Sequence, residues 1–260
     1  MSDAQRGAGM AVEDDQPIRP ASSIVLGRDG GAGLELFMLE RTSAAVFAGG
    51  MHVFPGGRVD DADHAPEYAG LCVGPSPVQA AQFAAIGEGA LGYWVAAIRE
   101  CFEEAGFLLA YGKDGRLVDL GGVAEQARFA AYRVALHDGT LTLAELCRRE
   151  GLRLAIDHMH FFHAWITPPG RPRRFDTRFF LAEVPRDQEG VHDDMETVSS
   201  HWITPQAAIA RNDAGSFGLM GPTRKQLETF AQVGSAAALV DLARNATDFP
   251  VYRPAVPPGR

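Results

Sequence analysis

The stretch Arg99-Glu100-Cys101-Phe102-Glu103-Glu104-Ala105-Gly106 places three carboxylates within about one helical turn. The surrounding segment 93–109 carries an apolar stripe at helical spacing, so we expect a helix that ends at Gly106. Positions i, i+3 and i+4 of a helix share one face, and Glu100, Glu103 and Glu104 should therefore converge on one patch. A strand expected at 52–54 meets Pro55-Gly56-Gly57 upstream, where a turn forms most easily with glycine.

The three carboxylates have two interpretations. Like charges at this spacing repel one another by a few tenths of a kcal/mol per pair when they are exposed, and the run then decorates a solvated face. A divalent cation would instead turn the repulsion into a site, since Mg²⁺ and Mn²⁺ prefer oxygen ligands and keep waters that a substrate phosphate can displace. The glycine turn would add a backbone carbonyl from Gly56.

Read together with Gly57, the stretch resembles the Nudix hydrolase superfamily, whose box reads G-x₅-E-x₇-R-E-U-x-E-E-x-G-U with U bulky and apolar. The residues that match its second half are Arg99, Glu100, Glu103, Glu104, Gly106 and Phe107. Six residues after Gly57 stands Asp63 in place of the usual Glu, and 35 residues, instead of seven, separate it from Arg99. A box interrupted at this point is similar to that of the peroxisomal coenzyme A diphosphatase branch, nucleoside diphosphate-linked moiety X motif 19.

The resemblance to this branch extends over about 24–210. It includes the segments 52–60, 97–109 and 174–180, the last of which reads Arg-Phe-Asp-Thr-Arg-Phe-Phe. Upstream of the box, Arg41 and Gly50 match a coenzyme A signature of related diphosphatases, whereas Val46 stands where that signature has an arginine.

The resemblance implies an α/β fold, a Nudix-type α/β/α sandwich with a mixed β-sheet plus helical insertions. It also implies metal-dependent hydrolysis of the diphosphate bond of a nucleoside diphosphate linked to another moiety, with coenzyme A or acyl-coenzyme A as the preferred substrate. Fold and box do not determine the substrate, so NADH and nucleotide-sugar hydrolysis stay open. From another class, the chain would be a non-catalytic, nucleotide-sensing Nudix domain.

The resemblance further implies roles for single residues. The expected catalytic residues are Arg99, Glu100, Glu103 and Glu104. Mg²⁺ or Mn²⁺ would be held by Glu100 and Glu104, with Glu103 and the Gly56 carbonyl assisting. Asp63 is the expected partner of Arg99, because in typical family members this arginine pairs with the first acid of the box.

Residues outside the box are candidates for binding the substrate: Arg41, Arg58, Arg174 and Glu196. Arg174 lies in a run with Arg171, Arg173 and Arg178, whose guanidinium groups would either bind a substrate phosphate bidentately or pair with surface acids. Glu196 matches a loop acid of the family, which would serve as a general base, or it is a solvated acid beside Asp193 and Asp194. Both alternatives stay open.

The organisation along the chain predicts one domain, 21–248, between a mobile tail at 1–20 and an extended tail at 249–260. Within it we expect an insertion at about 64–92 and a helical elaboration at about 121–151, which either covers the active site or builds a homodimer surface. The expected strands are 22–26 and 34–39, joined as a hairpin, followed by 161–166, 177–184 and 198–203. Further helices are expected at 122–137, 141–150, 204–211 and 222–244.

The resemblance implies a small-molecule nucleotide conjugate as partner, and the net charge argues against two other classes of partner. The 260 residues carry a net charge of −9, so neither nucleic acid nor an anionic membrane surface has an electrostatic reason to bind. Three cysteines without a CxxC spacing fit a reducing compartment, and we expect a cytoplasmic protein. Segment 68–87 is uncharged but interrupted by two prolines, and segment 1–20 has no apolar core, so we expect neither a transmembrane helix nor a signal peptide.

One histidine cluster invites a zinc hypothesis. In a strand, His158 and His160 would share a face while His163 points away, and no cysteine lies at ligand spacing. Histidines that are satisfied within the core or exposed are therefore the favoured interpretation.

Overall fold

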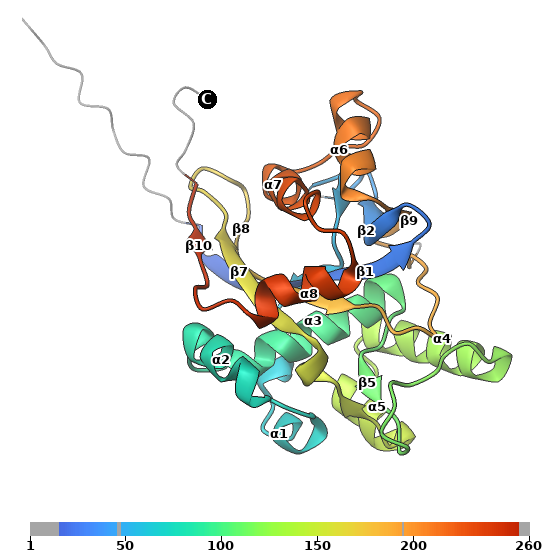
Figure 1. Ribbon diagram of the computed structural model, residues 1–260. Helices are drawn as coiled ribbons and strands as arrows, with labels where there is room; N and C mark the ends of the chain where they lie inside the picture. The colour runs from blue at the N-terminus through green and yellow to red at the C-terminus, as the bar shows by residue number, and fades with distance from the viewer. Residues whose placement is uncertain (1–15, 46–47, 194, 255–260) are drawn as a thin grey trace, which may run out of the picture.

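A computed structural model describes residues 16–45, 48–193 and 195–254. The parts of the predicted tails at 1–15 and 255–260 lie outside these residues, as do Val46 and Asp194. The strands of the main sheet are β1 (Ile18–Gly30), β2 (Gly33–Arg41), β3 (His52–Val53), β4 (Gly56–Arg58), β7 (His160–Ile166), β8 (Arg174–Glu183), β9 (Thr197–Ile203) and β10 (Val251–Tyr252). They follow the order β10-β7-β8-β1-β2-β3, with β4 paired to β1 and β9 paired to β2 (Figure 1). A separate pair joins β5 (Ala110–Tyr111) to β6 (Arg153–Leu154).

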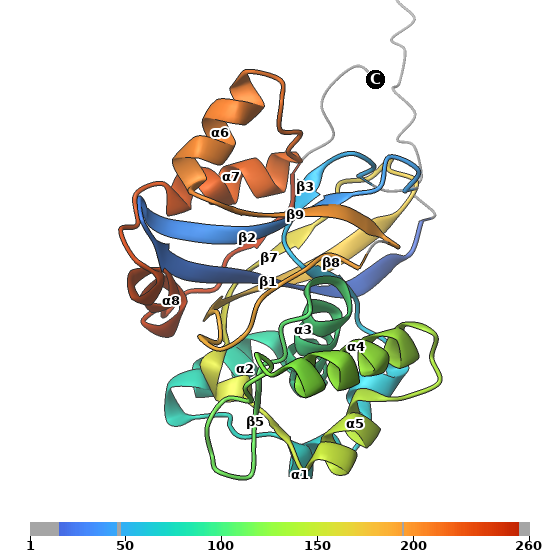
Figure 2. The same cartoon turned by 90° about the vertical axis from the view of Figure 1, so that its right-hand side faces the viewer.

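Helices cover both faces of the sheet. Figure 2 shows α1 (Tyr68–Leu71), α2 (Ala80–Ile86), α3 (Ala90–Ala105), α4 (Val123–His137) and α5 (Leu143–Glu150) below it, and α6 (Pro205–Asp213) and α7 (Gly221–Phe230) above it. The last helix, α8 (Ala236–Arg244), packs into the same core as α6 and α7. Short 3₁₀ turns occur at Asp61–His64, Pro77–Gln79 and Ile156–His158. The predicted α/β class with a mixed sheet is confirmed.

The side chains of the central strands alternate between two separate hydrophobic cores, one on each face of the sheet. In β1, Ile24 and Leu26 face the core that contains α3, while Val25 between them faces the core of α6 to α8. In β2, Leu36 and Met38 likewise face α6 to α8. Because side chains of a strand alternate between faces, each of these strands needs a nearly continuous apolar run, as the sequence has.

Strand β1 has different partners along its two edges. Along one edge, β1 pairs with β8 in parallel from Ile18 to Gly27. Along the other edge, its first part pairs with β4 and its last part pairs with β2. The glycines of β4 thus lie against β1, with Gly57 beside Glu100 of α3.

Several element boundaries differ from the predictions. The predicted hairpin is present, but β1 already begins at Ile18, so residues 18–20 belong to the sheet and not to a tail. Helix α3 does end at Gly106, with φ +77°, but residues 107–109 are not helical. The single helix predicted at 222–244 is wrong: it is two helices, because the Ser235 side chain accepts a hydrogen bond from the N–H of Ala238 and starts α8 anew.

The insertion 64–92 is part of the core. Gln79 and Gln82 are buried, and Gln79 donates to the carbonyls of Ile156 and Met159 at 2.6 and 2.7 Å. Gln82 accepts from the N–H of Phe161 at 3.0 Å and so holds α2 against β7. The elaboration 121–151 contributes buried side chains to the same core through α4 and α5. The structure therefore attaches both segments to the sheet and to α3.

The cysteines and the helices were the subject of two predictions, a lack of disulfides and a lack of membrane spans. Cys72, Cys101 and Cys147 are buried free thiols, consistent with the absence of a disulfide framework. Within the described ranges, no helix has the length and apolar character needed to cross a bilayer. A cytoplasmic location and a homodimer stay predictions.

The three histidines of the zinc hypothesis do not gather into a group of metal ligands among the described residues. His158 is exposed, whereas His160 and His163 are both buried. The prediction that His163 points away from His160 is wrong, because the register irregularity between Phe161 and His163 pairs the two histidines with Leu181 and Phe179, which lie on one face of β8.

We predict that these buried histidines make the fold sensitive to acid. Burial lowers the pKa of His160 and of His163 from 6.5 to about 4. The folded state therefore keeps both rings neutral, while the unfolded chain binds their protons below pH 6.5, and stability is lost as the pH falls from about 6.5 to about 4. Replacing His163 by Gln should reduce the loss of unfolding free energy between pH 7 and pH 5 by about 1–2 kcal/mol, measured by urea denaturation. An unchanged loss of unfolding free energy between pH 7 and pH 5 in His163→Gln would contradict this explanation.

Candidate active site

The glycine turn brings β4 into contact with the carboxylates of α3. Gly56 has φ +153°, and a Cβ there would lie 2.3 Å from the carbonyl oxygen of Ser22. At Gly57 a Cβ would lie 2.5 Å from the Glu100 carboxylate, so that carboxylate occupies the space of the missing side chain. The N–H of Gly56 donates to Oε2 of Glu104 at 2.9 Å. Both glycines are therefore needed for the close approach, as the turn predicts.

The guanidinium of Arg99 contacts three of the carboxylates at this site. Its Nε and Nη2 donate to the two oxygens of Asp63, both at 2.9 Å, and Asp63 is 1% exposed. Its Nη1 donates to Glu100 at 2.8 Å and reaches Glu103 at 3.5 Å. The predicted pairing of Arg99 with Asp63 is confirmed across the whole length of the insertion. A bidentate arginine of this kind restrains its carboxylates in one geometry.

The carboxylates lie in an electrostatic environment that favours a cation. Burial is the main cause that raises the pKa of Glu100, of Glu103 and of Glu104. The positive charge of Arg99 acts to lower the pKa of Glu100 and of Glu103, whereas the negative charge of Glu100 raises the pKa of Glu104 further. Burial penalises the charged form of each group, and a positive charge at this place would offset that penalty.

The carboxylates do not converge as tightly as the helix spacing predicts. They are not a group of three whose ligand atoms all lie within 4.8 Å of one another among the described residues. Glu103 is held by Arg99, while Glu104 faces the glycine turn. The donor set that fits a hard cation is thus Glu100 and Glu104, two carboxylates of α3 that face the glycines of β4, whereas Glu103 contacts Arg99.

Arg41 joins the carboxylates to a second loop. Its guanidinium lies 3.5 Å from Glu104 and 3.0 Å from Glu196. Its buried Nε has no hydrogen-bond partner among the residues that the structure describes. Asp193 shapes the loop, since its Oδ1 accepts from the N–H groups of Met195, Glu196 and Thr197. Burial would raise the pKa of Asp193, but these hydrogen bonds lower it overall, so the loop is held by a carboxylate charge.

A cavity of about 480 Å³ opens in front of these groups. Its polar lining comes from the carboxylates of α3 and from Arg41, Arg58, Arg173 and Glu196. Its apolar lining includes Val53, Phe54, Trp165, Phe175, Phe179 and Met220. The cavity therefore offers cationic, anionic and aromatic walls together, which is the composition expected for a nucleotide conjugate.

The segment 174–180 supplies one wall of the cavity. Phe175, Thr177 and Phe179 alternate along β8 and all line it. Arg173, and not Arg174, is the arginine of the run that borders the cavity, while Nε of Arg174 donates to the carbonyl of Thr167 at 3.1 Å. Arg178 pairs with Asp176, in agreement with the surface-pairing alternative. A role of Arg174 in substrate binding stays a prediction.

Two features of this site were not predicted: the aromatic wall and the loop formed around Asp193. A signal for the wall was present in the alternation of Phe175, Thr177 and Phe179. The signal for the loop was the pair Asp193 and Thr197, whose spacing allows one side chain to cap the turn. Arg58 lines the cavity as predicted, and it also pairs with Asp60 at 2.7 Å.

Comparisons with known proteins found a matching family and several relatives. The family model described as NUDT19 Nudix domain matches residues 19–226. A Gallus gallus protein named acyl-coenzyme A diphosphatase NUDT19 is 30% identical over 248 residues, covering 82% of this chain and 65% of its own length. Its Homo sapiens namesake is 29% identical, covering 68% and 55%. This chain thus spans less than two thirds of the length of these relatives.

A solved structure shows the same fold. The NUDIX hydrolase from Alicyclobacillus acidocaldarius superposes with a TM-score of 0.73 at 25% identity, covering 89% of this chain and 97% of that one. The expected sandwich with helical insertions is confirmed by this likeness.

Proposed function

We propose, from the premise that this chain belongs to the NUDT19 Nudix domain family, that it hydrolyses the diphosphate bond of a nucleoside diphosphate linked to another moiety. The substrate we propose is coenzyme A or an acyl-coenzyme A. The observation that carries the proposal is the buried carboxylate of Glu104, hydrogen-bonded to Gly56 and next to Glu100 at the wall of a cavity that also contains arginines.

Glu100 and Glu104 would hold the Mg²⁺ or Mn²⁺ on which we propose that activity depends. Such an ion supplies charge neutralisation on the diphosphate and lowers the pKa of an attacking water. Arg99 holds Glu100 from the side opposite Asp63, so the carboxylate is oriented before the ion arrives. Gly56 does the same for Glu104 through its N–H. This preorganisation is our proposed contribution of the box residues.

The cationic wall is suited to the phosphates. Arg58 and Arg173 border the cavity, and the buried Nε of Arg41, which has no hydrogen-bond partner in the described part of the chain, lies beside Glu104. A phosphate oxygen would accept a hydrogen bond from this Nε. The negative charge of the phosphate would also offset the positive charge of the three arginines. Glu196 pairs with Arg41 at the cavity, and we propose that it keeps this guanidinium in place against the substrate.

The aromatic wall is suited to the rest of the substrate. Trp165, Phe175 and Phe179 give an apolar surface on the side of the cavity formed by β7 and β8. Aromatic rings bind a base by stacking and an acyl or pantetheine chain by burial of apolar area. The names of the two vertebrate relatives, acyl-coenzyme A diphosphatase, support this choice of substrate.

A panel of diphosphate conjugates with Mg²⁺ or Mn²⁺ tests the proposal. We expect coenzyme A or an acyl-coenzyme A to be cleaved with the highest kcat/KM, into 3′-phosphoadenosine phosphate and the phosphopantetheine fragment, as water attacks one phosphorus and the bridging P–O bond breaks. Mass spectrometry in H₂¹⁸O identifies which phosphate takes up the oxygen. Preferred cleavage of NADH or a nucleotide sugar would refute the substrate assignment. Tight binding of one conjugate without turnover of any would refute the enzyme and favour a nucleotide sensor.

A further inference from the structure

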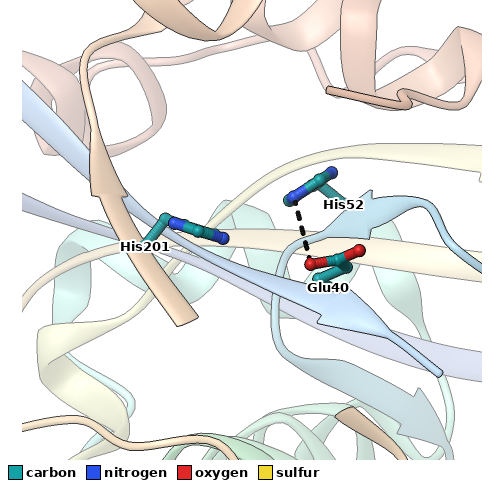
Figure 3. A group of neighbouring side chains, drawn as sticks. All are labelled: Glu40, His52 and His201. Carbon is teal, nitrogen blue, oxygen red and sulfur yellow. Dashed lines mark ion pairs between the residues drawn. The ribbon is translucent and has the colours of Figure 1, made fainter. Parts of the chain in front are cut away.

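A second group of metal-ligand side chains lies on the other face of the sheet. Glu40 is on β2, His52 on β3 and His201 on β9, and their ligand atoms all lie within 4.8 Å of one another. Figure 3 shows the three side chains gathered from these neighbouring strands. The strand register explains the arrangement: His52 pairs with Glu40, and His201 pairs with Met38, whose side chain packs with α6 to α8. This face is separate from the face that α3 covers.

The hydrogen bond of His52 leaves its Nε2 available as a ligand. Its Nδ1 lies 3.3 Å from the carbonyl oxygen of Gly218, and its Nε2 lies 3.9 Å from Oε2 of Glu40, beyond hydrogen-bond distance. With the proton on Nδ1, the ring donates to Gly218, and Nε2 presents a lone pair on the side of Glu40. Metal-binding histidines adopt this arrangement, with the second nitrogen donating to a carbonyl.

The remaining ligands are oriented by one hydroxyl. Ser199 Oγ donates to Oε2 of Glu40 at 2.7 Å and lies 3.0 Å from Nε2 of His201. The ring of His52 stacks on Phe217 with centroids 3.4 Å apart, which restrains its orientation. The side chain of Glu40 is 37% exposed, while that of His52 is 6% exposed. The group is thus preorganised from within and open to solvent on the side of Glu40.

We propose that Glu40, His52 and His201 form a second cation site, which takes a divalent transition-metal ion such as Zn²⁺. Two imidazoles and one carboxylate suit Zn²⁺ or Co²⁺, whereas the all-oxygen donors of α3 suit Mg²⁺ or Mn²⁺. The two sites thus differ in the ion that they select. An ion here would join β3 to β2 and β9, and β3 leads directly into the turn at 54–57 that contacts Glu104. The site would stabilise the turn from the opposite face of the sheet.

Metal titration of the full chain tests the proposal without any measurement of turnover. The chain carrying Glu100→Gln and Glu104→Gln, which lacks the carboxylates facing the cavity, is freed of metal with a chelator and titrated with Co²⁺, followed by visible absorption. We expect one equivalent to bind, and Zn²⁺ to displace it. Adding Glu40→Gln or His201→Gln should weaken this binding at least about tenfold, since each removes one ligand.

The matched control is His158→Gln, which changes an exposed histidine outside the group and should leave Co²⁺ affinity unchanged. Glu40 and His201 are only half-buried, and a thermal melt of each variant verifies that it is folded. Failure of the chain to bind Co²⁺ when Glu100 and Glu104 are replaced would overturn the proposal. So would equal affinity in the Glu40→Gln and His201→Gln variants. Neither outcome bears on the diphosphatase, because the assay does not depend on turnover.

Discussion

Replacing Glu104 by Gln is expected to lower kcat for diphosphate hydrolysis on the order of 10³-fold, with a smaller change in KM. The substitution keeps the shape of the side chain, and its amide oxygen still accepts the hydrogen bond of Gly56. What it removes is the charge of a ligand to the proposed ion. Steady-state kinetics with Mn²⁺ and the best substrate of the panel measure the effect.

Stability distinguishes this effect from damage to the fold. Glu104 is 5% exposed, so without metal the neutral side chain should melt at the same temperature as wild type or higher, because a buried charge is gone. Adding Mn²⁺ should raise the melting temperature of wild type and leave that of the variant nearly unchanged. Glu183→Gln, at an exposed position of β8 outside the cavity, is the control with normal rate and normal metal response. A near-normal rate in Glu104→Gln would show that the metal assignment is wrong.

The core of the site was predictable from local spacing. The carboxylates of α3 occur at fixed offsets within one helix, and the helix ends at a glycine whose φ is positive. The partner of Arg99 was predictable for a different reason. Asp63 keeps the sequence spacing from Gly57 that the first acid of the box has. The insertion follows Asp63 in the sequence, and the chain then returns so that Arg99 contacts Asp63.

The outer parts of the site depend on strand register. Arg173 and Arg174 are neighbours in the sequence, and only the pairing of β8 with β1 decides which of them borders the cavity. A shift of one residue exchanges the two faces of a strand, and the arginine run carries no signal that sets this register. The same limit applies to the group formed by Glu40, His52 and His201. Its members come from three strands, at spacings that match no motif.

The insertion shows why burial is hard to predict from composition. Gln79 and Gln82 reduce the hydropathy of the segment 68–87, and composition does not show where their amides lie. Both amides lie in the core, where they bond to backbone groups about 80 residues further along the chain. A buried amide is tolerated when such partners exist, and they exist only once β7 has formed. The break between α7 and α8 is different, because Gly234-Ser235 is a local signal that the periodic pattern on both sides obscures.

Replacing Arg99 by Ala is expected to be among the most destabilising single changes in the chain, costing about 3–5 kcal/mol of unfolding free energy. The guanidinium is 13% exposed and holds Asp63, Glu100 and Glu103 at once. Its removal leaves Asp63, which is 1% exposed, as an unpaired buried charge. Urea denaturation measures the loss, and hydrolysis should fall with it, because Glu100 loses the group that orients it.

A double-mutant cycle with Asp63→Asn shows whether the loss comes from this pair. With Arg99 already replaced, neutralising Asp63 should restore part of the stability, giving a coupling energy of about 2 kcal/mol. The exposed pair of Arg58 and Asp60, only a few residues away, is the internal standard, and Arg58→Ala should cost less than about 1 kcal/mol. Additive effects of Arg99→Ala and Asp63→Asn would mean that the ion pair does not connect the two halves of the box. In that case the glycine turn alone would have to place β4 against α3, and Gly57→Ala, which forces a Cβ against the Glu100 carboxylate, would become the change that disrupts the site.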